Sequence, residues 1–314
     1  MKKNSKIYVA GGQSGLVGTA IVRALKAQGF TNIIVKTRKH VDLLDQRQVD
    51  IFFQKEKPEY VFLSAALVGG IMANKTRKAD FIYDNLLIQN NVIHYSWKYG
   101  VKKLLFLGSS CIYPKLAPQP IKEEYFMTGP LEETNDAYAV AKIAGIKMCQ
   151  SYNEQYKTNF VSVMPTNLYG PNDNFDLQSA HVLPAFIRRF YEAKKNNKKD
   201  IILWGSGKAY RELLYVDDMA EACVFLMKNY NSSEIINIGT GKDLKIRELA
   251  QLVKKIVGYS GKIVWDSSKP DGTPKKQLDV TKLFKLGWKP RISLEEGIKK
   301  EYEWFLNNFS GKKQ

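Results

Sequence analysis

The fold is decided by a stretch near the start of the chain, Ile7-Tyr8-Val9-Ala10-Gly11-Gly12-Gln13-Ser14-Gly15-Leu16-Val17-Gly18. Residues 6–10 are a short apolar run of the kind that forms a buried strand. Glycines at positions 12, 15 and 18 allow a sharp turn, and they let a ligand approach the backbone because they carry no Cβ atom. The next segment has apolar residues at helical spacing, which are Ala20, Ile21, Ala24 and Leu25. The N-terminus of such a helix offers free N–H groups and a positive dipole to a pyrophosphate.

Further strands and helices alternate along the first half of the chain. After residues 6–10, the expected strands are 33–35, 60–65, 103–108 and 159–164. Alternation of this kind predicts an α/β protein with a parallel sheet and right-handed crossovers, a Rossmann-type doubly wound sheet. The pattern changes after Pro171, where polar loops separate shorter elements and suggest a smaller α/β lobe. We therefore expect a dinucleotide-binding domain at 1–170 and 213–240, and a substrate-binding lobe at 171–212 and 241–314.

The end of the second expected strand indicates which dinucleotide binds. NAD-binding folds place an acidic residue about 20 residues after the glycine-rich turn, where it holds the ribose hydroxyls. Here the segment reads Lys36-Thr37-Arg38-Lys39, with no carboxylate before Asp42. A guanidinium binds phosphate in a planar fork, so Arg38 predicts NADP with its 2′-phosphate. For Lys36 and Lys39 a solvated basic turn is an equally good interpretation.

The candidate reaction centre lies around the fourth strand and the helix after it. Ser109 follows the apolar run 103–107 and Gly108, and Tyr138 and Lys142 are spaced to share one face of a helix. A nearby ammonium lowers the pKa of a tyrosine toward the range in which it can exchange a proton with an alkoxide. A serine hydroxyl beside it can bind the same substrate oxygen. Taken alone, a tyrosine and a lysine at this spacing also fit an ordinary surface helix.

Composition sets outer limits on the function. The chain has 314 residues and a formal net charge of +17, and 44% of its residues are hydrophobic. We expect no membrane span, since no window of eighteen apolar residues exists, and the apolar run at 7–10 is too short for a signal peptide. Three widely spaced cysteines show no metal-ligand pattern, so we expect free thiols, no metal site and a cytoplasmic location. Scattered lysines favour anionic ligands, and we expect only weak, salt-sensitive binding of nucleic acid.

Four motifs together give a resemblance to a known family. They are Gly-Ser-Ser-Cys-Ile-Tyr-Pro-Lys (108–115), Ala-Lys-Ile-Ala-Gly-Ile-Lys (141–147), Val-Met-Pro-Thr-Asn-Leu-Tyr-Gly-Pro (163–171) and Lys-Pro-Asp-Gly-Thr-Pro (269–274). The chain resembles the extended short-chain dehydrogenases/reductases that act on nucleotide sugars, over essentially its whole length. Cys111 and the His181 segment are similar to those of the branch that converts GDP-4-keto-6-deoxy-D-mannose.

The resemblance implies an NADP-dependent enzyme, expected to be a homodimer, that inverts C3 and C5 of this sugar and then reduces the C4 ketone. It implies that Cys111 is the base and His181 the acid of the epimerisation. It also implies that Ser109 and Tyr138 stabilise the sugar oxygen, and that Lys142 holds the nicotinamide ribose. A thiol acts as a base only where positive charge lowers its pKa, and an imidazole can donate a proton near neutrality. By residue type alone, a cysteine at such a position is more often a small buried side chain, and a lone histidine in a polar loop is more often solvated.

The same resemblance implies two binding sets. The cofactor set comprises Gly12, Gln13, Ser14, Gly15, Leu16, Val17, Gly18, Arg38, Leu107, Gly108, Lys142, Pro165, Thr166, Asn167, Leu168 and His181. The set for the GDP part of the substrate comprises Arg189, Trp204, Arg211, Asp271 and Lys276. Relatives often carry an arginine in the glycine-rich loop where this chain has Gln13-Ser14. The preference for NADP therefore depends on Arg38.

Two other functions remain open at this point. One is a 4-epimerase or 4,6-dehydratase of the same family, although a dehydratase needs an acidic pair where this chain has Ser110-Cys111. The other is a regulator that binds NADP without catalysis, and such proteins typically lose the Tyr or the Lys that are present here.

Overall fold

A central parallel sheet organises the protein, seen here in a computed structural model that describes residues 1–269 and 271–309. Six strands form this sheet, in the order β2 (Ile33–Ile34), β1 (Ile7–Ala10), β3 (Tyr60–Leu63), β4 (Lys103–Leu107), β5 (Phe160–Pro165) and β9 (Ile236–Ile238). Every neighbouring pair is parallel, so all carboxyl ends meet at one edge. The strand order reverses between β1 and β3, and ligands bind at such a switch point in doubly wound sheets.

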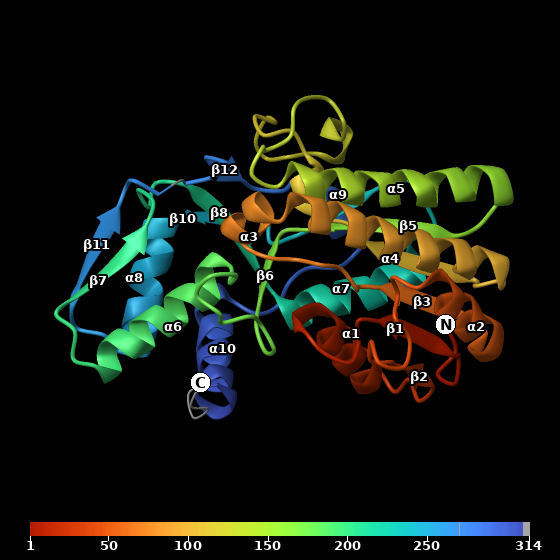
Figure 1. The fold of residues 1–314 in the computed structure, drawn as a ribbon, viewed down its shortest axis with the longest axis horizontal. Helices are drawn as coiled ribbons and strands as arrows, with labels where there is room; N and C mark the ends of the chain where they lie inside the picture. The colour runs from red at the N-terminus through yellow and green to blue at the C-terminus, as the bar shows by residue number, and fades with distance from the viewer. Residues whose placement is uncertain (270, 310–314) are drawn as a thin grey trace.

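Helices cover both faces of this sheet because successive side chains on each strand point to opposite sides. Ile7 and Val9 pack against α1 (Leu16–Ala27) and α7 (Val216–Asn229). Tyr8 and Ala10 face the other side, which is covered by α2 (Gln46–Glu56), α4 (Lys78–Lys98) and α5 (Asp136–Tyr156). Figure 1 shows α4 lying beside α5, and α1 lying near α7. The expected α/β doubly wound fold is confirmed.

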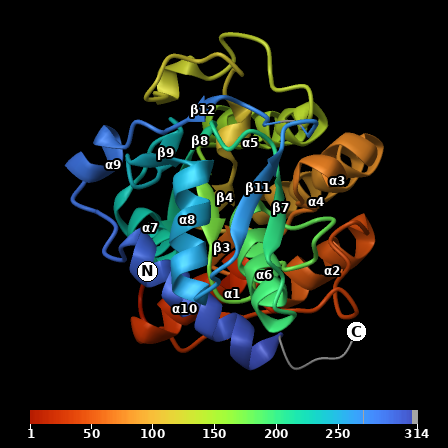
Figure 2. The same cartoon turned by 90° about the vertical axis from the view of Figure 1, so that its left-hand side faces the viewer.

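Beyond one end of the sheet lies a second hydrophobic cluster, separate from the core on the two faces of the sheet. The helices and strands that surround it are at the front of Figure 2. Its helices are α6 (Val182–Lys195), α8 (Ile246–Val257) and α10 (Leu294–Asn308). Two small sheets accompany them. β7 (Asp200–Trp204) pairs with β11 (Lys262–Asp266), and β8 (Tyr210–Tyr215) pairs with β6 (Asn167–Tyr169), β10 (Asp243–Lys245) and β12 (Lys275–Lys276). The short helices α3 (Ile71–Thr76) and α9 (Thr281–Lys285) complete the fold.

Most local expectations agree with these elements. The expected strands occur within two residues of their observed bounds, and Ala20, Ile21, Ala24 and Leu25 are buried. The two- and three-residue strands β6, β10 and β12 lacked a recognisable sequence signal. Pro270, part of one quoted motif, lies outside the described residues, and the division into 1–170 with 213–240 and 171–212 with 241–314 remains a prediction.

Two further findings concern the composition. All three cysteines, which fall within the described residues, are free thiols, as expected from their spacing. Among the helices of the described residues, none has both the length and the apolar character to cross a membrane.

The start of α2 provides a test of local stability. Asp45 is the N-cap residue, and its carboxylate accepts hydrogen bonds from the backbone N–H groups of Arg47 and Gln48. We expect Asp45→Ala to lower the free energy of unfolding by about 1 kcal/mol, because both N–H groups lose their acceptor. Denaturant unfolding measures this, with Asp45→Asn as a control that keeps an acceptor oxygen. Equal stability of Asp45→Ala and the wild type would contradict the capping role.

Candidate active site

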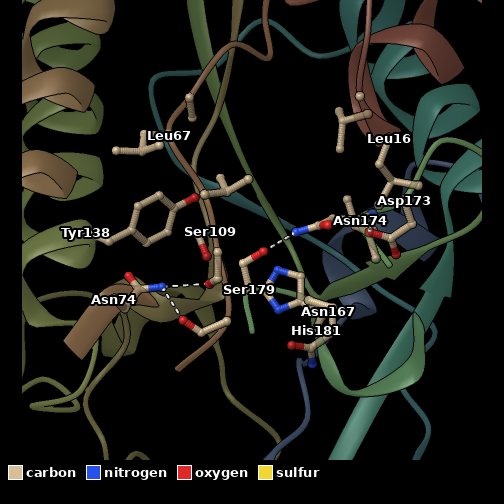
Figure 3. Close-up of a pocket in the computed structure, with 18 of the residues that line it drawn as sticks. Leu16, Leu67, Asn74, Ser109, Tyr138, Asn167, Asp173, Asn174, Ser179 and His181 are labelled. Carbon is tan, nitrogen blue, oxygen red and sulfur yellow. Dashed lines mark hydrogen bonds between the residues drawn. The ribbon is translucent and has the colours of Figure 1, made fainter. Parts of the chain in front are cut away.

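A cavity of about 1180 Å³ opens at the carboxyl edge of the central sheet. It extends from the glycine-rich turn after β1, past the ends of β3 and β4, to the residues around Trp204 and Arg211. In the view of Figure 3, Tyr138 enters from one side and His181 from the other, with Ser109 between them. A single cleft is therefore lined both by the switch point of the sheet and by residues of the elements around the second hydrophobic cluster.

The glycine-rich turn has the geometry of a phosphate cradle. A Cβ atom on Gly18 would lie 1.9 Å from the carbonyl oxygen of Gly11, so only glycine allows α1 to lie this close to the turn. Gly15 has a φ of 80°, and among the described residues no atom lies within 4 Å of where its Cβ would be. No side chain of the described residues caps α1 at this end. The first N–H groups of the helix therefore face the cleft, as binding of a dinucleotide pyrophosphate requires.

The basic residues after β2 line the end of the same cleft. Arg38 donates from Nε to Asp42 Oδ2 at 3.0 Å, and its side chain is 72% exposed. Lys36 lies 3.6 Å from the Glu56 carboxylate, so part of its charge is already compensated. Arg38 retains guanidinium N–H groups that a 2′-phosphate can reach.

Ser109 and Tyr138 form the oxygen-binding part of the site. Ser109 follows β4 and begins a 3₁₀ turn, Ser110–Ile112, in which the Cys111 N–H donates to Ser109 Oγ at 3.1 Å. Tyr138 lies in the first turn of α5, and its hydroxyl points toward Ser109 (Figure 3). The expected lowering of the pKa of Tyr138 is not found. Burial raises it, the charge of Cys111 raises it further, and the hydrogen bond with Ser109 lowers it only in part.

The position of Lys142 explains this difference. Its ammonium donates to the Leu107 carbonyl at 2.8 Å and lies 5.8 Å from the centre of the Tyr138 ring. It is therefore bound to the backbone and not to the phenol oxygen. Lys142 is 3% exposed, and burial lowers its own pKa to about 7.

Cys111 and His181 are placed on different walls of the cleft. Cys111 lies on the turn after β4, and His181 is the N-cap residue of α6. Burial raises the pKa of the Cys111 thiol, but the charge of Lys276, hydrogen bonds with Ser109 and Lys276, and the charge of Arg211 lower it by more. The pKa of His181 is lowered, first by desolvation and then by the charge of Lys276. The site thus holds a thiol that ionises readily and an imidazole that releases its proton readily.

At the far end of the cleft, aromatic and cationic side chains meet. The Arg189 guanidinium lies 5.2 Å from the centre of the Trp204 ring, and Trp204 is 46% exposed. Arg211 donates to the carbonyls of Tyr210, Thr273 and Asp271, and burial lowers its pKa. The Asp271 carboxylate accepts from the backbone N–H and the hydroxyl of Ser206. An exposed indole and fixed guanidinium groups are suited to a base and a diphosphate.

The cleft contains all of the expected site residues except Gly12. Gly12 is buried, and a Cβ there would lie within 3.0 Å of Val35, Val9 and Val22, so packing explains this glycine. The sequence reasoning missed Glu132 and Asn135, which also line the cleft. Asn135 is the N-cap residue of α5, so its sequence pattern indicates a helix start and gives no sign that it lines the cleft.

Lys142 gives a prediction about pH. A buried amine with a lowered pKa binds fewer protons in the folded chain than in the unfolded chain between about pH 7 and its usual value of 10.5. Its contribution to stability therefore rises with pH across this window. We expect Lys142→Met to raise the free energy of unfolding at pH 7 by about 1–2 kcal/mol, and the gain to shrink toward pH 10. Thermal unfolding across this pH range measures it. Exposed Lys147 on the same helix supplies the control, Lys147→Met, and identical pH profiles for Lys142→Met and the wild type would contradict the effect.

Comparison with known proteins places this site in context. The chain is 59% identical over 314 residues to "Putative GDP-L-fucose synthase 2" of Arabidopsis thaliana, covering 100% of this chain and 95% of the relative. It is 52% identical over 312 residues to "GDP-L-fucose synthase" of Escherichia coli K12, covering 96% of this chain and 97% of the relative.

Solved structures agree over nearly the full length. A GDP-6-OMe-4-keto-L-xylo-heptose reductase from C. jejuni superimposes with a TM-score of 0.93 at 44% identity, covering 98% of this chain and 99% of that one. A GDP-L-fucose synthetase from Naegleria fowleri bound to NADP gives a TM-score of 0.91 at 32% identity, covering 100% and 98%.

The family model for NAD dependent epimerases/dehydratases matches residues 7–239, which include the glycine-rich turn, Ser109, Tyr138 and Lys142. The chain therefore belongs to the NAD dependent epimerase/dehydratase family, whose members are extended short-chain dehydrogenases/reductases, as its sequence motifs predicted.

Proposed function

We propose that this chain is an NADPH-dependent epimerase-reductase that converts GDP-4-keto-6-deoxy-D-mannose into GDP-L-fucose. The observation that carries the proposal is the meeting of a hydroxyl pair, an acidified thiol and an imidazole in one cleft above a phosphate cradle. Relatives named GDP-L-fucose synthase at 52% and 59% identity support this choice of substrate.

The epimerisation uses the acidity that a C4 ketone gives to the hydrogens on C3 and C5. Cys111, as a thiolate, removes one of these protons, and charge develops on the ketone oxygen. The hydroxyls of Ser109 and Tyr138 stabilise that oxygen by hydrogen bonds directed to it. His181 returns a proton to the carbon from the other wall of the cleft, which inverts the centre.

The reduction uses the same oxygen-binding pair. A nicotinamide held in the cradle would supply the hydride for C4, and Ser109 and Tyr138 would bind the oxygen on which negative charge then develops. Tyr138 donates its proton to this oxygen, and a raised pKa suits a group that must be protonated before the step. Lys142 lies beneath the Tyr138 ring, where its ammonium is positioned for the ribose of the cofactor.

The cofactor site fits NADP(H). The cradle at Gly15 and the uncapped α1 suit the pyrophosphate, and the free N–H groups of Arg38 suit the 2′-phosphate. The Naegleria fowleri relative, which has the same fold, is described as bound to NADP. At the other end, Trp204, Arg189, Arg211 and Asp271 are proposed to bind the GDP moiety.

The homodimeric state in this proposal rests on the resemblance to the family. The cytoplasmic location rests on the three widely spaced cysteines, which are free thiols.

A second candidate is a reductase for a GDP-4-keto-heptose. It is favoured by the C. jejuni heptose reductase, which shares the fold at a TM-score of 0.93 and 44% identity. Both sugars present a C4 ketone to the same hydroxyl pair, and they differ at C6. The higher identity of the GDP-L-fucose synthases makes the 6-deoxy sugar the first choice.

An assay with identification of the product tests the function. The purified chain is incubated with NADPH and GDP-4-keto-6-deoxy-D-mannose, and the product sugar is identified by NMR. We expect NADPH oxidation and GDP-L-fucose. Lack of NADPH oxidation would overturn the proposal, and a higher kcat/KM with a GDP-4-keto-heptose would favour the second candidate.

Arg38 tests the choice of cofactor. We expect Arg38→Ala to weaken NADPH binding by about 10- to 100-fold and to leave NADH binding nearly unchanged, because charge-assisted hydrogen bonds to the 2′-phosphate are lost. Fluorescence titration with both cofactors measures the two affinities. Lys39→Ala, in the same turn, is the matched control, and equal weakening for NADPH and NADH would refute the assignment.

Two substitutions separate the two half-reactions. Tyr138→Phe should lower the reduction rate by at least about 100-fold while NADPH still binds, since the proton donor is lost. Cys111→Ser should suppress solvent-deuterium exchange at C3 and C5 more than reduction of an already epimerised ketone. NADPH consumption and NMR detection of deuterium report the two activities, and equal loss of both in Cys111→Ser would argue against a thiolate base.

A further inference from the structure

Two nitrogen donors converge on the sulfur of Cys111. Lys276 Nζ lies 3.2 Å from Cys111 Sγ, and Asn135 Nδ2 donates to the same sulfur at 3.2 Å. Neutral thiols accept hydrogen bonds weakly, whereas a thiolate accepts them strongly and is stabilised by an adjacent ammonium. The arrangement around Cys111 therefore matches the ionised sulfur.

The donors come from distant parts of the chain. Cys111 lies on the turn after β4, Asn135 is the N-cap residue of α5, and Lys276 ends β12, 165 residues after the cysteine. Each donor belongs to a different element, so the pocket around the sulfur exists only in the folded chain.

A buried carboxylate holds Lys276 in place. β12 pairs with β8, with Lys276 opposite Arg211. The next residue, Glu212, is fully buried, and its carboxylate accepts from the Leu278 N–H at 2.7 Å and from the N–H groups of Thr240 and Gly241. The strand that carries Lys276 is thus fixed by its pairing with β8 and by the hydrogen bond from Leu278, two residues after the lysine.

Other charged or titratable groups also surround the sulfur. The charge of Arg211 on β8, like that of Lys276, lowers the pKa of Cys111. Tyr138 faces it from α5, where the charge of Cys111 raises the tyrosine pKa. Glu132 lines the cleft beside Cys111, but its carboxylate is paired with Lys115 at 3.3 Å. The charge of Lys276 also lowers the pKa of His181, after the larger effect of burial.

We propose that Lys276 and Asn135 are positioning residues that keep Cys111 as a thiolate, so that the base of the epimerisation is a thiolate–ammonium pair. This inference rests on the proposed function for its role in catalysis, and it adds a task for Lys276 beyond binding the GDP part of the substrate.

The pair also couples the two proton transfers. Before the step, the negative charge of the thiolate compensates the positive charge of Lys276, which favours the protonated form of His181. When Cys111 accepts the proton from the sugar carbon, the sulfur becomes a neutral thiol and the charge of Lys276 is no longer compensated. The imidazolium of His181 is then destabilised, and it delivers its proton to the opposite face of the carbon. The sulfur gains one proton and the imidazole loses one, so the net charge of the site does not change.

Selective alkylation of the full chain by iodoacetamide tests the thiolate without substrate. The other cysteines, Cys149 and Cys223, are completely buried, and burial raises the pKa of both, so Cys111 is the thiol expected to react. Mass spectrometry follows the rate of labelling at Cys111 from pH 5 to 10, and Cys111→Ser confirms the site of modification.

We expect Lys276→Met to shift the midpoint of this pH profile upward and to slow labelling at pH 7 by about tenfold, since a shift of one pKa unit changes the thiolate fraction tenfold. Lys276→Arg keeps the charge and should stay within about twofold of the wild type. Asn135→Ala should give a smaller shift in the same direction. Lys275→Met is the matched control, because this neighbouring lysine on β12 pairs instead with Asp243 at 3.4 Å, and it should leave the profile unchanged.

An unchanged labelling profile in both Lys276→Met and Asn135→Ala, with normal thermal unfolding, would overturn the inference. So would an equal shift in Lys275→Met. The outcome is independent of the proposed function, because labelling needs no sugar: a shifted profile in a chain that does not turn over the substrate would refute the function alone. If both hold, Lys276→Met should also lose deuterium exchange more than reduction of an epimerised ketone.

Discussion

The close approach of α1 to the turn after β1 is the constraint on which the site depends. A hydrogen atom is all that fits between Gly18 and the carbonyl of Gly11. This contact lets the helix begin immediately outside the carboxyl end of β1, so its free N–H groups point into the cleft. The reversal of strand order between β1 and β3 keeps that space open, and every other feature of the site is arranged around it.

Burial is the second shared feature of the site. Lys142 and Tyr138 both lie where solvation is poor, and each is shifted toward its neutral form, the amine downward and the phenol upward in pKa. The Cys111 thiol is the exception, because Lys276 and Arg211 offset the cost of burying its charge. The cleft thus combines a phenol that holds its proton more firmly with a thiol that releases its proton more readily, which suits the proposed epimerisation followed by a reduction.

The strands beyond the end of the central sheet are proposed to contribute to the chemistry as well as to binding of the substrate. β8 provides Arg211 and the buried Glu212, and β12 pairs with β8 to bring Lys276 back to the turn after β4. Arg211, which is proposed to bind the diphosphate, and Lys276, which is proposed to hold the thiolate, are therefore neighbours in one sheet. A shift in this sheet would alter both the binding of the nucleotide by Arg211 and the protonation of Cys111 by moving Lys276.

The sequence by itself determined the elements that depend on local pattern. The doubly wound fold was predicted from the apolar run before the glycines, the helical spacing after them and the alternation of strands and helices. The i to i+4 spacing of Tyr138 and Lys142 predicted part of the cleft. Motifs around Cys111 and His181 identified the branch of the family. Only the tertiary structure decided which charges act on each group. The ammonium of Lys142 binds a backbone carbonyl and leaves the pKa of Tyr138 high, while Lys276 and Asn135 reach Cys111. The reason is physical: a pKa depends on burial and on atoms a few ångströms away, and residues 24 and 165 positions apart come that close only when the chain has folded.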